Sequence, residues 1–141
     1  MTKSALYRIC QYPKYFFLAK GEFSLHSPFV FAFFTNVIKR KKYKKGSQNQ
    51  QLICNIKNYL PSYKILNLSV TDTYSHFNDF ISTPCSVIVI DDFRLCRQNF
   101  LLWQKIINTD CRFISLDFFS FGILINNPDI RCKQNYILKK H

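Results

Sequence analysis

The pattern of apolar and polar positions predicts an α/β chain. Residues 65–70 and 86–90 are short apolar runs rich in β-branched side chains, as expected of buried parallel strands. Residues 74–81 between them have helical spacing, with Tyr74, Phe77 and either Phe80 or Ile81 expected on the buried face. One of three polar residues is expected to cap that helix, namely Thr71, Asp72 or Thr73.

The C-terminal half continues the alternation of strand and helix. Residues 97–108 form a predicted helix with Phe100, Trp103 and Ile107 inward. Three more strands are then expected, over residues 111–116, 121–125 and 135–139. The pattern indicates a doubly wound sheet with parallel core strands and an antiparallel C-terminal hairpin, in which ligand chemistry gathers at the carboxyl ends of the parallel strands.

Helices are predicted before the sheet. Ser27 and Pro28 are a typical start for a helix that continues to about residue 38, and further helices are expected over residues 7–20 and 50–59. Residues 46–51 are polar and mark the best boundary, which divides the chain into a basic helical segment, 1–45, and a reduced α/β domain, 46–141. Most aromatic residues of the first segment are expected in the core, with three exposed, namely Tyr12, Tyr15 and Tyr43.

Composition is that of a globular protein. The 141 residues are 48% hydrophobic and 17% aromatic, and no apolar run reaches the roughly 18 residues of a membrane-spanning helix. The N-terminus has no secretory pattern, so we expect a cytoplasmic protein without a transmembrane segment. Six cysteines occur without a CxxC pair, which favours reduced thiols packed as small hydrophobic side chains.

The net charge of +12 is concentrated near the N-terminus. Residues 1–45 contain ten Lys or Arg against one Glu, giving +9. The peak consists of Lys39, Arg40, Lys41, Lys42, Lys44 and Lys45. Such a run suits RNA or another anionic surface, and it is equally typical of a solvated linker.

Few residues are candidates for chemistry. Asp91 and Asp92 follow the second strand, but two carboxylates are too few for a metal site, so no metal is expected. An alternative is that one aspartate caps the following segment and the other pairs with Arg94 or Arg97. No nucleophile elbow occurs, and no catalytic residue is assigned.

Several segments together resemble a group of bacterial class I S-adenosylmethionine-dependent methyltransferases. These are Ser86-Val-Ile-Val-Ile-Asp-Asp-Phe-Arg94, the helix around Trp103, the Asp117-Phe-Phe-Ser-Phe-Gly122 hairpin and His26-Ser-Pro-Phe29. The resemblance implies a Rossmann-like fold, methyl transfer and S-adenosylmethionine as cofactor. Any retained cofactor would be held by Asn67, Ser69, Asp91 and Asp92.

The chain departs from that group where the cofactor would bind. Asn67 and Ser69 stand where the group has an acid and a glycine-rich turn, and none of the three glycines lies in residues 64–73. Residues 81–85 leave no room for the strand that would grip the ribose. We therefore expect a degenerate, inactive methyltransferase-like protein that needs no cofactor.

The sequence is also consistent with two other hypotheses about function. One is a nucleic-acid or ribonucleoprotein-binding module on a reduced Rossmann-like scaffold, and the other is an enzyme whose site is completed by a partner chain. In each case the strand 65–70 has a bare edge, which we expect the N-terminal helices or another chain to cover.

Overall fold

The structure is a computed structural model that describes residues 3–19, 27–39 and 48–138. Its helical elements are α1 (Lys3–Leu18), α2 (Pro28–Phe33), the π-helical turn η2 (Phe34–Ile38), α3 (Gln48–Tyr59), α4 (Val70–Ser75), α5 (Phe77–Ser82) and α6 (Arg97–Ile107). Its strands are β1 (Lys64–Asn67), β2 (Ser86–Ile90), β3 (Ile114–Asp117), β4 (Gly122–Asn126) and β5 (Gln134–Ile137).

The five strands form one mixed sheet in the order β1-β2-β4-β3-β5. β1 and β2 are parallel neighbours joined by α4 and α5, which confirms the predicted crossover. β3 and β4 form the predicted antiparallel hairpin, and β4 lies between β2 and β3. β5 runs parallel to β3 at the opposite edge from β1.

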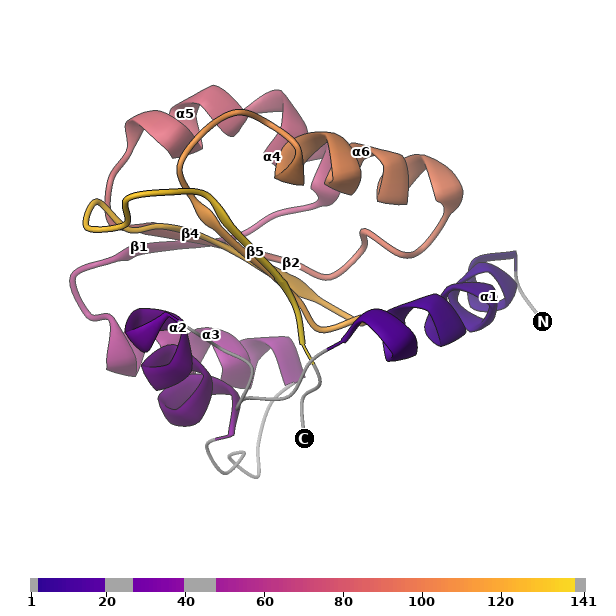
Figure 1. Cartoon of the computed structure of the whole chain (residues 1–141), viewed down its shortest axis with the longest axis horizontal. Helices are drawn as coiled ribbons and strands as arrows, with labels where there is room; N and C mark the ends of the chain where they lie inside the picture. Colours follow the sequence, from indigo (N-terminus) through magenta and orange to yellow (C-terminus); the bar gives the residue numbers. More distant parts are fainter. Residues whose placement is uncertain (1–2, 20–26, 40–47, 139–141) are drawn as a thin grey trace.

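Helices cover both faces of the sheet (Figure 1). One face packs against α4, α5 and α6 through a core that includes Phe80, Ile88 and Trp103. The other face packs against α2, η2 and α3 through a core that includes Phe33, Ile56 and Val87. All five residues of β2 are buried, because β2 has strands on both sides and helices above and below.

Of the helices before the sheet, α2 begins as the sequence predicts, whereas α1 and α3 begin earlier than the predicted residues 7 and 50. The Val30 amide donates to the Ser27 hydroxyl, at 3.4 Å, and Pro28 occupies the first turn of α2. Residues 40–47, where the predicted boundary between two segments falls, lie outside the described residues. α2 and η2 share one hydrophobic core with the sheet, so their apolar side chains are partnered by strand residues such as Val89 and Ile123.

The crossover helices differ from the prediction in their start and in their buried face. The predicted strand 65–70 is wrong at its end, since β1 stops at Asn67 and α4 begins at Val70, because Ser69 rather than a later residue caps the helix. Phe77 and Phe80 are buried as predicted, whereas Tyr74 is 45% exposed. The break between α4 and α5 at His76 rotates the second helix, so Tyr74 leaves the face that Phe77 and Phe80 share.

α1 continues through Pro13 and lies beside the sheet rather than over either face (Figure 1). Tyr15 is buried, contrary to the prediction, because its hydroxyl donates to the Leu138 carbonyl at the end of β5. Tyr12 is half exposed as predicted, whereas Phe17 is 85% exposed and not in the core. Tyr43 lies outside the described residues.

The six cysteines form no disulfide in the structure. Cys85, Cys96 and Cys111 are half-buried, but Cys10 and Cys54 are exposed, as is Cys132, so only part of the set packs as small hydrophobic side chains. None of the helices in the described ranges combines the length and apolarity needed to cross a bilayer.

Candidate functional site at the carboxyl ends of β1 and β2

The parallel pairing of β1 and β2 brings their carboxyl ends to the same level. Asn67 is the register partner of Val89, and the Leu68 amide donates to the Val89 carbonyl at 3.1 Å. The segments that follow the two strands are therefore neighbours, as the sequence predicted. They contain the predicted candidates Asn67 and Ser69 from one strand and Asp91 and Asp92 from the other.

Asp92 binds the start of α4. Its Oδ1 accepts a hydrogen bond from the Val70 amide, at 2.8 Å, and its backbone carbonyl accepts one from the Asn99 side chain, also at 2.8 Å. Burial raises the pKa of the Asp92 carboxyl, and the hydrogen bond from Val70 offsets part of that rise. The carboxylate thus fixes the turn after β1 to the turn after β2.

Ser69 completes this arrangement. Its Oγ accepts a hydrogen bond from the Asp72 amide, at 3.1 Å, and its carbonyl accepts one from the Thr73 hydroxyl, at 2.8 Å. Val70 and Thr73 are fully buried. Two amides of the first turn of α4 are therefore held by Ser69 and Asp92, and the side chains of this turn fill the space beneath it.

The other two predicted residues are exposed. Asn67 ends β1 and Asp91 follows β2, with both side chains facing solvent. Arg94 does not pair with either aspartate, contrary to the alternative in which one of them would bind it. The pairing of an aspartate with Arg94 is therefore wrong, and the pairing with Arg97 stays a prediction. An aspartate does have a capping role, but the helix capped is α4 and not the segment that follows.

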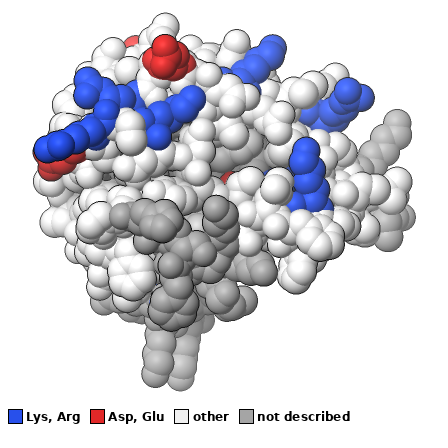
Figure 2. Space-filling model, viewed as in Figure 1, with Lys and Arg blue, Asp and Glu red and all other residues white. Residues whose placement is uncertain are grey.

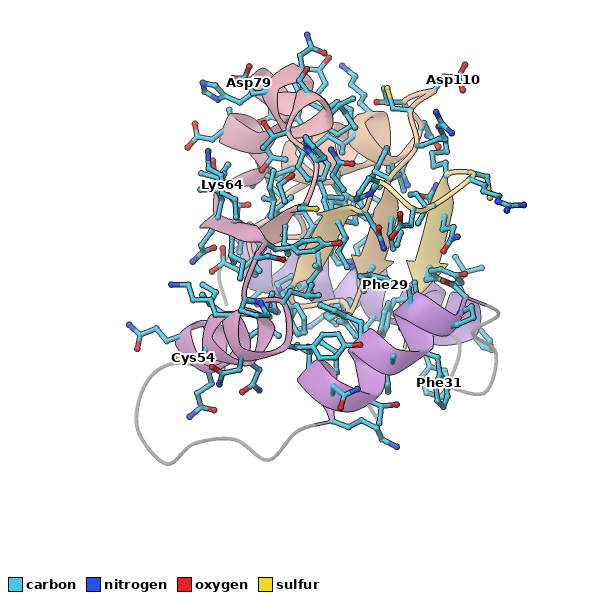
Figure 3. All side chains as sticks on the ribbon, turned by 90° about the vertical axis from the view of Figure 1, so that its left-hand side faces the viewer. Phe29, Phe31, Cys54, Lys64, Asp79 and Asp110 are labelled. Carbon is cyan, nitrogen blue, oxygen red and sulfur yellow. The ribbon has the colours of Figure 1, made fainter. Side chains whose placement is uncertain are left out.

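A groove of about 430 Å³ runs beside β1 on the side of α4 and α5. Figure 3 shows Lys64 and Asp79 on the side of the molecule that carries this edge. In the described part of the chain, no strand pairs with the outer edge of β1. The groove has an apolar base of Leu66, Leu68, Phe80 and Ile88 and a polar rim of Lys64, Asp72, His76, Asp79, Thr83 and Ser86.

The structure also contains a buried ion pair that the sequence did not predict. The two terminal nitrogens of the Arg94 guanidinium, Nη1 and Nη2, donate to the Asp117 carboxylate at 2.5 and 2.7 Å, and Nη1 also donates to the Phe119 carbonyl at 3.1 Å. Four rings, of Tyr15, Phe93, Phe100 and Phe119, lie 4.8 to 5.4 Å from the Arg94 guanidinium.

This ion pair lines a small cavity of about 150 Å³ between α1, α6, β3 and β5. The Nε atom of Arg94 has no hydrogen-bond partner among the described residues. Since Arg94 and Asp117 neutralise each other, the pair supports the packing of α1 and α6 on the sheet rather than acid–base chemistry. The sequence singled out the segments that contain Arg94 and Asp117. It could not predict their contact, because the two residues are 23 positions apart in the chain.

No group of three or more His, Cys, Asp or Glu side chains that could hold a metal ion occurs within the described ranges. Of the predicted basic run, Lys39 is exposed at the end of η2. Arg40, Lys41, Lys42, Lys44 and Lys45 lie outside the described residues.

Comparisons of the chain with protein families, with curated proteins and with solved structures gave no match.

Proposed function

We propose that this chain is a degenerate class I methyltransferase-like protein with a reduced Rossmann-like fold that does not bind S-adenosylmethionine with useful affinity. The parallel β1–β2 pair with its helical crossover supports this proposal. The β3–β4 hairpin, which carries Asp117 and Gly122 as register partners, also supports it. Both features contain the residues on which the resemblance rests.

The main observation behind the proposal that the cofactor does not bind is the hydrogen bond between the Asp92 carboxylate and the Val70 amide. The resemblance implies that backbone approaches the cofactor closely at the turn after β1, which requires glycine. Here each residue from Ser69 to Thr73 has a side chain, and Asp92 and Ser69 hold two amides of that turn. The residues present therefore do not fit the cofactor, and we derive no methyl-transfer step.

Calorimetric titration of the full chain with S-adenosylmethionine and with S-adenosylhomocysteine tests the proposal. We expect no binding tighter than about 1 mM, which corresponds to about 4 kcal/mol. An active methyltransferase titrated under the same conditions is the positive control. A micromolar dissociation constant would contradict the proposal, and Asn67, Ser69 and Asp91 would then be the first positions to substitute.

A nucleic-acid-binding module is the second candidate, and the charge distribution favours it. Residues 1–45 carry +9 of the net +12. On the face shown in Figure 2, Lys and Arg side chains form one group at the upper left, and further ones are scattered singly over the surface. Cationic side chains that replace the counterions of a phosphate backbone would give binding without sequence preference.

A further inference from the structure

Exposed hydrophobic side chains are concentrated on α1. Among the described residues, ten large hydrophobic side chains are exposed, and six of them belong to this helix. The other four are scattered over α2, α4, α6 and the connection before α6. Single exposed hydrophobic residues are normal, but a cluster on one helix indicates a surface that contacts an apolar partner.

Four of the six exposed hydrophobic residues, Leu6, Ile9, Phe16 and Phe17, share one side of α1. Leu6, Ile9, Pro13 and Phe17 follow one another at spacings of three or four residues, and all are exposed. We call this side the outer face of α1, which consists of Leu6, Ile9, Cys10, Pro13, Phe16 and Phe17. Phe17, at 85%, is the most exposed of its large hydrophobic side chains.

The opposite side of α1 is attached to the sheet. The buried Tyr15 hydroxyl donates to the Leu138 carbonyl. The rings of Tyr12 and Tyr15 lie 5.2 and 5.1 Å from the Phe119 ring, and the Arg8 guanidinium lies 5.8 Å from it. These contacts hold the outer face away from the sheet. Because α1 extends from one side of the molecule (Figure 1), a flat surface can reach it.

Charge distinguishes between partners for this face. The sequence of α1 contains three basic residues, Lys3, Arg8 and Lys14, and no acidic residue. A second copy of the chain would bring the same positive charge against it, and each copy carries +12. A bilayer with anionic headgroups offers both the opposite charge and an apolar interior.

The dimensions of α1 fit a helix that lies in the plane of a membrane. Its 16 residues span about 24 Å. A helix that lies parallel to the membrane surface can bury one apolar face, here the outer face, at the boundary between headgroups and acyl chains. Lys14 is exposed and comes directly after Pro13 of the outer face, so its ammonium group can reach the lipid headgroups. We propose that α1 docks this protein on anionic phospholipid membranes, with the outer face inserted between the lipids.

Vesicle flotation of the full chain tests this proposal, with phosphatidylcholine vesicles and with vesicles that also contain phosphatidylserine. We expect binding to the anionic vesicles that weakens as salt is raised. The Phe17→Ser variant should bind about tenfold more weakly, because it loses one aromatic side chain from the inserted face. Phe17 is 85% exposed, so this change leaves the core intact.

The Phe31→Ser variant is the matched control. Phe31 is 40% exposed on α2, and Figure 3 shows it pointing outward from that helix. It should bind as wild type does. Equal vesicle binding by wild type and Phe17→Ser would overturn the proposal, because basic residues alone would then explain it. The absence of wild-type binding, or a Phe17-dependent dimer or RNA complex in its place, would overturn it as well.

Discussion

The Asp92 carboxylate accepts a hydrogen bond from the Val70 amide at 2.8 Å, and this contact joins the carboxyl ends of β2 and β1. In open α/β sheets this is the place where a ligand would approach the first turn of the crossover helix. An acidic side chain of the chain itself takes that position here.

Replacing Asp92 tests whether the contact is structural. Asp92→Ala should lower the free energy of unfolding by about 1 kcal/mol at neutral pH, because it leaves the Val70 amide without its acceptor. Asp92→Asn should cost less, because its carbonyl oxygen can still accept. Urea unfolding followed by circular dichroism measures both, and equal losses for the two variants would contradict the capping role.

The pH dependence of stability follows from the raised pKa of Asp92. Because the folded chain holds this proton more tightly than the unfolded chain does, wild type loses stability relative to Asp92→Asn as pH rises from the ordinary aspartate pKa through the raised value. Urea midpoints of wild type and Asp92→Asn across that window measure the difference. A difference that stays constant with pH would contradict burial of the carboxyl.

Breaking the Arg94–Asp117 ion pair should be costly. Arg94→Met leaves Asp117, which is 4% exposed, without its counter-charge, and we expect a loss of about 3–5 kcal/mol. Arg94→Met combined with Asp117→Asn should recover part of this loss, because no unpaired charge then remains. The stability of Arg94→Lys should lie between those of wild type and Arg94→Met, since an ammonium keeps the charge but cannot make the two parallel hydrogen bonds. Strictly additive losses in this double-mutant cycle would contradict a direct interaction.

Gly122 should not tolerate a side chain. A Cβ at this position would lie 2.7 Å from Cη2 of Trp103 and 3.2 Å from Cε1 of Phe93. Trp103 is buried and its ring centroid lies 4.4 Å from that of Phe93, so neither ring can move freely. Gly122→Ala should therefore cost about 1–3 kcal/mol.

A second substitution separates this steric effect from a backbone effect. The smaller ring in Trp103→Phe should make room, so Gly122→Ala should cost less in the Trp103→Phe background than in wild type. Thermal unfolding followed by circular dichroism reports both values. The same cost in both backgrounds would show that the ring contact is not the cause.

The basic run provides the test of the nucleic-acid candidate. If it binds a phosphate backbone, replacing Lys41, Lys42, Lys44 and Lys45 with Gln should weaken RNA binding. The slope of the logarithm of the binding constant against the logarithm of salt concentration should also become shallower, by roughly three to four units. Fluorescence anisotropy over a range of salt concentrations measures this slope. Equal binding by wild type and the variant, or no binding by either, would leave the run as a solvated linker.

Much of the fold could be predicted because it rests on local patterns. The apolar run Ser86–Ile90 is a strand in any context that buries it, and the predicted parallel pairing with β1 is confirmed. Ser27 and Pro28 fix the start of α2, because the Ser27 hydroxyl accepts a hydrogen bond from the nearby Val30 amide and Pro28 fits the first turn. The carboxyl ends of the two strands could likewise be placed side by side, since parallel neighbours end at one edge.

The partners of the polar side chains could not be predicted in the same way. Asp92 binds a residue 22 positions away and Arg94 one 23 positions away, so these contacts exist only once the strands have paired. Tyr15 and Phe17 are two residues apart on the same helix, yet one is buried and the other exposed. The sequence by itself determined the order of the strands and helices, because that order depends on periodicity, although it misplaced the junction of β1 and α4. Only the tertiary structure decided which side of α1 faces the sheet and which acid closes the turn after β1, because these depend on contacts between segments distant in the chain.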